Sequence, residues 1–145
     1  MIPRHNNPLT AVPRIRVHPT LTYQRRERPR TSEHDPFESR ITNEIDGLES
    51  IYQAIKHILM TERGKYRIYP LWYGVELDQY LKKPFGYFCA TIKQTLENAL
   101  LADDRMHSVT INRAWQVDID AAAVDFTVHT NLGNISMRAE VALTV

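Results

Sequence analysis

Apolar residues recur at helical spacing in the middle of the chain. The spacing of three and four places them along one face of a helix, at Leu48, Ile51, Ile55, Ile58 and Leu59. Asp46 is a good N-cap residue, and Glu49 follows three positions later, close to a capping box. Gly64 suits the residue just after a helix, with Arg63 and Lys65 near the negative helix end. The pattern predicts a helix that is capped by Asp46 and terminated by Gly64 as its C′ residue.

A second helical pattern begins at Pro84 and runs to about Ala102. Proline suits the first turn of a helix because its missing N–H costs nothing there. The recurring positions are Phe88, Thr91, Ile92, Thr95, Leu96, Ala99 and Leu100. Cys89 lies beside Phe88 inside this helix, and we expect a small buried hydrophobe there rather than a nucleophile.

From Met106 onward the period changes to two, which is typical of strands. The first set, interrupted by Arg113, is Val109, Ile111, Trp115, Val117 and Ile119; the second is Ala122, Val124, Phe126 and Val128; the third is Ile135, Met137, Ala139, Val141 and Leu143. Residues 118–120 and 131–134 are plausible turns. The fold class is therefore predicted as α+β, with two main helices packed on a three-stranded antiparallel meander.

The segment between the two helices is rich in aromatic residues. They are Tyr66, Tyr69, Trp72, Tyr73 and Tyr80. Because Pro70 and Gly74 bracket residues 71–73, the chain turns there. One interpretation is a ligand pocket. We favour a wedge, in which the rings fill the edge of the core and their polar tips reach a partner.

The first 40 residues differ in composition from the rest. They hold 10 of the apolar residues and six of the eight prolines, whereas residues 41–145 hold 52 apolar residues. They carry eight Arg and four acids, a net charge of +4, so the remainder is −3. We therefore expect an extended Arg/Pro-rich arm over residues 1–40 and a folded domain over residues 41–145. Within the arm, residues 14–17 and 20–23 alternate weakly, and either could add an edge strand.

The arm contains the densest basic cluster of the chain, formed by Arg25, Arg26, Arg28 and Arg30. One interpretation is binding to nucleic acid, since Arg forks match phosphate oxygens. Glu27 lies within the run and no aromatic residue is interleaved. We therefore favour an arm that lies on an acidic protein partner.

The sequence provides little that could carry a reaction. The histidines show no metal-ligand spacing, the glycines form no phosphate-binding loop, and Cys89 is the single cysteine. We expect no catalytic, cofactor-binding or metal-binding residues. No run of 18 apolar residues exists and residues 1–8 lack the apolar part of a signal peptide, so we expect an intracellular protein that spans no membrane.

One charged group, Asp103-Asp104-Arg105, falls where the second helix gives way to the first strand. Residues two apart do not face each other on a helix, so Asp103 and Arg105 can pair only if the chain turns there. Such a pair is either part of a solvated loop or an oriented contact for a partner, and composition alone leaves both open.

In its order of motifs the chain resembles the small baseplate wedge or sheath-initiator family of contractile phage tails and phage-tail-like bacteriocins. The resemblance covers residues 41–141. The motifs are a helix ending in Leu-x-Thr-x-x-Gly at 59–64, Pro70, the aromatic-Gly pair 73–74, the acidic-x-Arg corner 103–105 and the closing strand 124–133. The family has Glu-Pro-Arg at the corner, where this chain has Asp-Asp-Arg, and the Arg/Pro-rich arm is also unusual.

This resemblance implies a virion structural protein of the tail baseplate, made in the cytoplasm of the host bacterium and present in six copies around the tail tube. Its partners would be the tail sheath protein, the larger baseplate wedge proteins and the tube. We expect the sheet of residues 107–143, which has two open edges, to recruit an extended sheath arm by strand addition. The expected partner-binding residues are Asp103, Arg105, Trp72, Tyr73, the four arm arginines, Ile135, Met137 and Val141.

Two other classes of function stay open. Part of the family has carried a lysozyme label. A peptidoglycan-degrading tail enzyme would use a pair drawn from acids such as Glu62, Glu76, Asp78, Asp103 and Asp104. No motif in the chain supports that label. A nucleic-acid-binding protein would use the arm arginines and show strongly salt-dependent binding.

Overall fold

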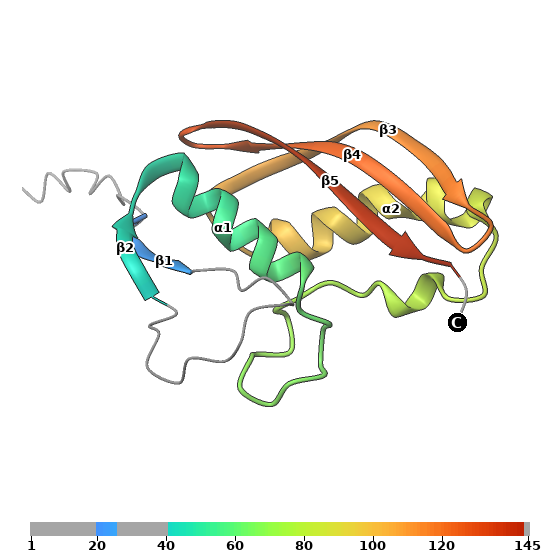
Figure 1. Ribbon diagram of the computed structural model, residues 1–145, viewed down its shortest axis with the longest axis horizontal. Coiled ribbons are helices and arrows are strands. Elements are labelled where there is room, and N and C mark those ends of the chain that lie inside the picture. The colour runs from blue at the N-terminus through green and yellow to red at the C-terminus, as the bar shows by residue number, and fades with distance from the viewer. Residues whose placement is uncertain (1–19, 26–40, 144–145) are drawn as a thin grey trace, which may run out of the picture.

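A computed structural model of the protein describes residues 20–25 and 41–143. This part of the chain is an α+β domain, as predicted (Figure 1). Its elements, in chain order, are β1 Thr22–Arg25, β2 Ile41–Ile45, α1 Gly47–Leu59, the 3₁₀ helix η1 Asp78–Tyr80, α2 Phe85–Leu100, β3 Met106–Asp118, β4 Ala121–Thr130 and β5 Gly133–Ala142.

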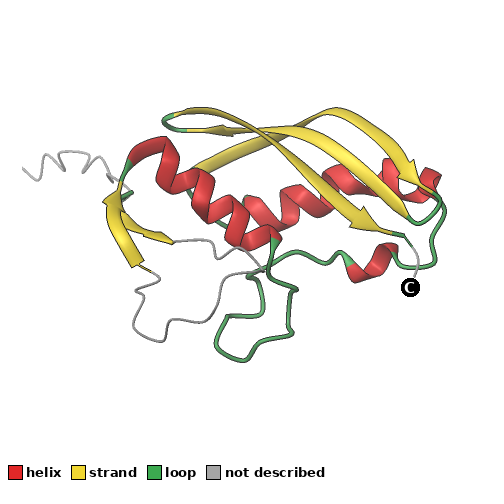
Figure 2. Ribbon diagram, in the orientation of Figure 1, coloured by secondary structure: helices red, strands yellow, loops and turns green. Residues whose placement is uncertain are grey.

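The main sheet has the antiparallel order β3-β4-β5, which confirms the predicted meander. Both helices lie on the same side of this sheet (Figure 2), with α2 against β3 and α1 against α2 and β5. The core between these layers is made of aliphatic and aromatic side chains. Its largest fully buried members are Tyr80, Phe88, Phe126, Ile51, Ile55, Ile92, Leu96 and Leu100.

The first helix begins as predicted but ends early. An Asp46 carboxylate oxygen accepts the N–H of Gly47 at 2.7 Å, as an N-cap does. The last helical residue is Leu59, so the prediction of an end at Gly64 is wrong. The reason is a long-range pairing: the N–H of Val75 donates to the carbonyl of Thr61 at 2.9 Å. This contact draws the chain out of the helix before Gly64.

The second helix confirms its predicted span to within two residues, since it ends at Leu100 rather than Ala102. Pro84 lies at the N-cap, one position before the helix, instead of in its first turn. The prediction that Cys89 is buried is wrong, because its side chain is exposed. One step along a helix rotates the side chain by about 100°, which moves it off the buried face marked by Phe88.

Strand β3 departs from the predicted alternation at one bulge. Ile111 pairs with Phe126 and Arg113 pairs with Asp125, so Asn112 is an extra residue on β3. The bulge reverses the two faces of the strand beyond it. After it, Ala114 packs against the core.

The prediction that Trp115 continues the core face of β3 is therefore wrong. The indole lies on the outer face of the sheet, where two guanidinium groups contact it. The Cζ atoms of Arg113 and Arg138 lie 5.2 and 4.9 Å from its ring centre. Beyond it, Val117 and Ile119 are also exposed rather than buried.

A second, two-stranded sheet is formed by β1 and β2. The expectation of an edge strand near residues 20–23 is confirmed by β1, whereas residues 14–17 lie outside the described residues. The side chain of Gln53 on α1 holds β1 in place. Its Oε1 accepts the N–H of Arg25 and its Nε2 donates to the carbonyl of Tyr23, both at 2.9 Å. One amide thus satisfies two backbone groups of β1.

Candidate partner-binding site

The corner after α2 folds around the pair Asp103–Arg105. The N–H of Asp103 donates to the carbonyl of Leu100, and the N–H of Met106 donates to the carbonyl of Asp103, both at 3.1 Å. These bonds make the turn that pairing of residues two apart requires. Arg105 Nε lies 2.9 Å from Asp103 Oδ1, and Nη2 lies 2.6 Å from Oδ2. The predicted pair is therefore formed, as a two-pronged fork.

This pair is held rigidly and is mostly covered. The backbone N–H of Arg105 also donates to Asp103 Oδ1 at 3.0 Å. The two side chains are only 17% and 19% exposed. The hydrogen bonds to Asp103 raise the pKa of Arg105 above its ordinary value, against the opposing effect of burial. The guanidinium consequently stays charged, in one fixed orientation.

Trp72 and Tyr73 lie beside this pair, although 30 residues separate them from it in sequence. Together with Asp103 and Arg105 they line a hollow of about 480 Å³, whose apolar wall is completed by side chains of both helices. Those side chains are Ile58 of α1 and Ala99 of α2, and Ala102, just beyond the end of α2, adds to the same wall. Two pairs of residues that lie far apart in the sequence thus converge on one hollow, which is apolar inside and charged at its rim.

Tyr73 is the anchor of the aromatic side of this hollow. Its ring stacks on Tyr69 with 4.6 Å between ring centres. Burial raises the pKa of the Tyr73 hydroxyl, and Tyr69 and the charge of Asp103 raise it further. The hydroxyl is therefore neutral at physiological pH and available as a hydrogen-bond donor.

A second hollow, of about 360 Å³, shares Tyr73, Asp103 and Arg105. Its other walls are the flank of α1 that carries Ser50 and the segment 20–22 at the start of β1. The Ser50 hydroxyl is buried there without a hydrogen-bond partner in the described part of the chain. Sequence reasoning missed this wall, because nothing in residues 20–22 indicates which surface β1 contacts.

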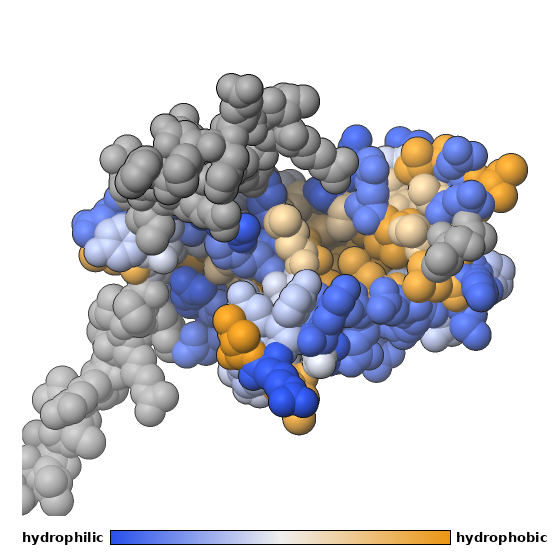
Figure 3. All heavy atoms as spheres, turned by 60° about the horizontal axis from the view of Figure 1, so that its bottom comes forward, coloured by the Kyte–Doolittle hydropathy of each residue, from blue (hydrophilic) through white to orange (hydrophobic). Residues whose placement is uncertain are grey.

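The aromatic segment between the helices only partly fits the expected wedge. Tyr73 packs against the core, but Trp72 is 57% exposed and Ile68 and Leu71 are each 82% exposed. The wedge prediction is therefore wrong for the residues before Tyr73, which project from the body. Figure 3 shows the molecule from the side of the loop between the two helices. Apolar side chains (orange) project there beside strongly polar ones, and apolar surface is gathered in a hollow.

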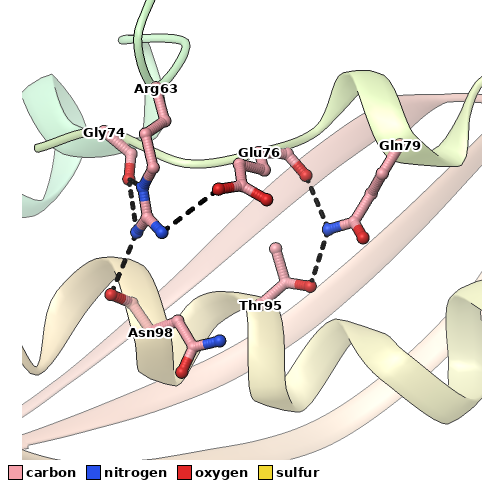
Figure 4. A network of polar contacts seen from close by, with 6 residues as sticks. All are labelled: Arg63, Gly74, Glu76, Gln79, Thr95 and Asn98. Carbon is pink, nitrogen blue, oxygen red and sulfur yellow. Dashed lines mark hydrogen bonds and ion pairs between the residues drawn. The ribbon is translucent and has the colours of Figure 1, made fainter. Parts of the chain in front are cut away.

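Arg63 fastens the base of this projecting loop to α2 (Figure 4). Its Nη2 donates to the carbonyls of Gly74 at 3.1 Å and Asn98 at 3.0 Å, and its Nη1 pairs with Glu76 at 3.3 Å. The loop leaves the domain after Arg63 and returns at Gly74. The guanidinium therefore holds both ends of the loop against the same helix.

A partly buried polar cluster continues this network of hydrogen bonds toward η1. The amide of Gln79 donates to the carbonyl of Glu76 at 2.8 Å and to the hydroxyl of Thr95 at 3.0 Å. The Tyr80 hydroxyl lies 2.7 Å from the same Thr95 oxygen. Tyr80, grouped with the other aromatics by its place in the sequence, is thus fully buried. It belongs to the core and not to the partner surface.

Strand β5 places Ile135, Met137 and Val141 on the core side of the sheet. Ile135 and Val141 are 8% and 4% exposed, and Met137 is half-buried. Their side chains are therefore covered by the protein itself. What β5 offers a partner is its backbone and its outward side chains, which are Asn134, Ser136, Arg138 and Glu140.

The backbone groups of β5 that point away from β4 can be assigned. The N–H of Leu143 donates to the backbone carbonyl of Asp120 at 2.7 Å, and the N–H of Asn131 donates to the backbone carbonyl of Arg105 at 3.2 Å. The backbone N–H and C=O groups of even-numbered β4 residues therefore point toward β5, and those of odd-numbered residues point toward β3. Because alternate residues of a strand point to opposite sides, the N–H groups of the four outward residues of β5 face the free edge. Within the described ranges no strand pairs with that edge.

The two edges of the main sheet differ in regularity. β5 pairs with β4 from Gly133 to Ala142 without a shift of register. β3 shifts register at three places against the same strand, between Met106 and Ser108, at Asn112, and between Gln116 and Asp118. Bulges disturb the spacing that an added strand would have to match, so β5 is the more regular of the two edges.

The remaining predicted contacts lie in the arm. Arg25 is exposed at the end of β1, and Arg26, Arg28 and Arg30 lie outside the described residues. In residues 20–25 and 41–143 no group of three His, Cys, Asp or Glu side chains could hold a metal ion. Over the same ranges no helix is long and apolar enough to cross a membrane.

Comparison with known protein families finds a match over most of the chain. A family model described as contractile injection system sheath initiator matches residues 31–133. No curated protein matches the chain. The match covers both helices, the corner 103–105 and the meander as far as the start of β5. The chain therefore belongs to the sheath initiator family of contractile injection systems.

Proposed function

We propose that this sheath initiator recruits the first sheath subunits by strand addition to β5 and joins the baseplate wedge through the hollow beside Asp103 and Arg105. The role is structural rather than enzymatic, at the tail baseplate, with six copies around the tube. The observation that carries the proposal is the regular, unpaired edge of β5.

The chemistry of strand addition suits this edge. Outward N–H and C=O groups recur at every second residue from Asn134 to Glu140 and need a partner or water. An extended sheath segment supplies complementary groups at the same repeat, so main-chain hydrogen bonds give affinity and side-chain alternation gives register. The ion pair between Arg138 and Asp125, at 2.7 Å, keeps the outward Arg138 side chain along the sheet.

The hollow beside Arg105 has the character of a docking surface for a larger neighbour. It combines apolar walls, an exposed Trp72 and a fixed guanidinium, and Trp, Tyr and Arg are the residues that dominate binding energy at interfaces. Asp103 and Arg105 in its lining are already paired with each other, so a partner meets an oriented group and the cost of ordering it is small.

Proline at the free edge of β5 tests the proposal. Glu140→Pro removes an N–H that points away from β4. Proline is tolerated at such a position, because the lost N–H is not used inside the sheet. Tails assembled with this variant are expected to lack sheath but keep the initiator bound to the wedge. Electron microscopy of the tails and co-purification with wedge proteins measure the two outcomes.

The matched control is Gln116→Pro on the other edge. Its neighbour Trp115 pairs with Ala123, an odd-numbered residue of β4 that faces β3, so the N–H of Gln116 also points outward. Sheath should form normally on this variant. Normal sheath on Glu140→Pro tails, with the variant folded by circular dichroism, would show that β5 is not the template.

A further inference from the structure

An apolar strip runs along the outer flank of α1. It consists of Leu48, Tyr52 and Leu59, whose spacing of four and seven places them in line along the helix. Leu48 is 41% exposed, Tyr52 is 44% exposed and Leu59 is half-buried. The neighbouring Ile51 and Ile55 are fully buried. The strip is thus an extension of the core that residues 20–25 and 41–143 leave partly exposed.

The strip lies on the side of α1 where β5 has its free edge. A Cβ atom at Gly133, the first residue of β5, would lie 3.3 Å from Leu48 Cδ1. The opposite flank of α1, with Ser50 and His57, faces the hollow beside Arg105. In Figure 1, α1 and β5 run in the same general direction. A strand added to β5 would therefore lie over this flank of the helix.

The repeats of a helix and a strand match at this place. Four residues of α-helix rise about 6 Å, the spacing of Leu48 and Tyr52. Two residues of a strand rise about 6.8 Å, the spacing of side chains on one face. Alternate side chains of an added strand would consequently meet Leu48 and Tyr52, whereas Leu59 lies about 10.5 Å beyond Tyr52 along the helix.

The outer face of the sheet has the opposite character. Polar side chains are joined across the strands: the hydroxyls of Thr127 and Ser136 lie 3.0 Å apart, and His129 Nδ1 lies 2.9 Å from Asn134 Oδ1. An added strand extends both faces of the sheet, so its outward side chains would join a polar surface. Its inward side chains would meet the strip.

We propose that the sheath segment which pairs with β5 is amphipathic, and that it buries alternate apolar side chains on the strip of Leu48, Tyr52 and Leu59. This inference rests on the proposed strand addition and names the chemistry of its partner. The strip then selects which face of the sheath segment turns inward, because a one-residue slip would place its polar side chains there.

Substitution of the strip tests this inference. The double variant Leu48→Ser/Tyr52→Ser keeps the β5 backbone intact and removes the apolar contact. We expect purified sheath protein to bind the immobilised full-length variant about tenfold more weakly, or worse, than the wild type. The milder Tyr52→Ser alone should show a smaller loss in the same direction, and it serves if circular dichroism shows the double variant unfolded.

Tyr87→Ser is the matched control, since Tyr87 is a helical tyrosine of similar exposure (39%) on α2. Sheath binding should be unchanged in it. Undiminished binding by the strip variants, or an equal loss in Tyr87→Ser, would overturn the inference. Glu140→Pro separates the two ideas: if it abolishes sheath binding while the strip variants bind normally, strand addition stands and the strip has no part in it.

Discussion

At the scale of single residues, Glu62 links two segments of the loop region. Its carboxylate accepts hydrogen bonds from the backbone of Asp78 and Leu77. Burial nevertheless raises its pKa, and the charge of Asp78 raises it further. The charged form is therefore less favourable in the folded protein than in the unfolded chain. The protonated form of Glu62 is therefore the one that favours folding. The stability it gives is fully present below the unfolded pKa and is lost as pH rises through the folded pKa.

We expect Glu62→Gln to raise the melting temperature at neutral pH, because the amide keeps an acceptor oxygen and removes the charge. The gain is of the order of 1–2 °C for a domain of this size. Near pH 4 the protonated wild type and the variant should melt together. Thermal unfolding at about pH 4 and about pH 7 measures both. A variant that is less stable than the wild type at neutral pH would contradict this account.

The residues of the site differ in how far sequence could place them. The pairing of Asp103 with Arg105 follows from a turn between helix and strand, which local pattern predicts. The meeting of this pair with Trp72 and Tyr73 depends on the path of a long loop, which local pattern does not determine. The exposure of Cys89 was missed for a simpler reason. A small apolar residue fits on either the buried or the exposed face of a helix, so its type does not show which face it occupies.

At the scale of elements, the projecting loop depends on one close backbone contact. A Cβ atom at Gly74 would lie 2.5 Å from the carbonyl oxygen of Thr61, and the residue has a φ of +100°. Gly64, at the other end of the loop, has a φ of +75° but nothing within 4 Å of its Cβ position. Both glycines are needed for their conformation, and Gly74 also for its space.

This difference predicts unequal effects of alanine. Gly64→Ala should cost about 1 kcal/mol, the price of a left-handed residue with a side chain. Gly74→Ala should cost about 3 kcal/mol, because the same strain is joined by a clash that parts Thr61 from Val75. Urea denaturation of the two variants measures the difference. Equal costs would mean that the contact between the loop ends contributes little.

The elements themselves were largely predictable from period. Strong alternation located β4 and β5, and helical spacing located α1 and α2. The early end of α1 was not predictable, because the bond between Thr61 and Val75 joins residues far apart in sequence. The bulge at Asn112 was also missed, since one inserted residue looks like an ordinary polar position until its partner strand is known.

At the scale of the whole molecule, a substitution at the corner 103–105 and one at the β5 edge should each impair a different interaction. We expect Arg105→Ala to weaken joining to the wedge by about tenfold or more, while bound molecules still initiate sheath. Arg105→Lys should restore little, because an ammonium group cannot reproduce the two-pronged contact with Asp103. Co-purification of wedge proteins with each variant is the measurement.

Arg138→Ala provides the matched control, as Arg138 also forms a two-pronged pair, with Asp125, but on the outer face of the sheet. It should join the wedge normally. If both alanine variants lose the wedge equally, or neither does, the corner is not the docking point. Melting temperatures of the variants show whether each still folds.

β5 keeps an even register and β3 shifts register at three places, so the two edges of the main sheet are not equivalent. With two equally regular borders, copies could stack on one another and form a filament without a tail. One irregular border prevents that, because each copy can accept a strand but offers no matching flat border in return. Under the proposed strand addition, growth would start at the baseplate and proceed only outward, and the initiator itself would not be consumed as a building block.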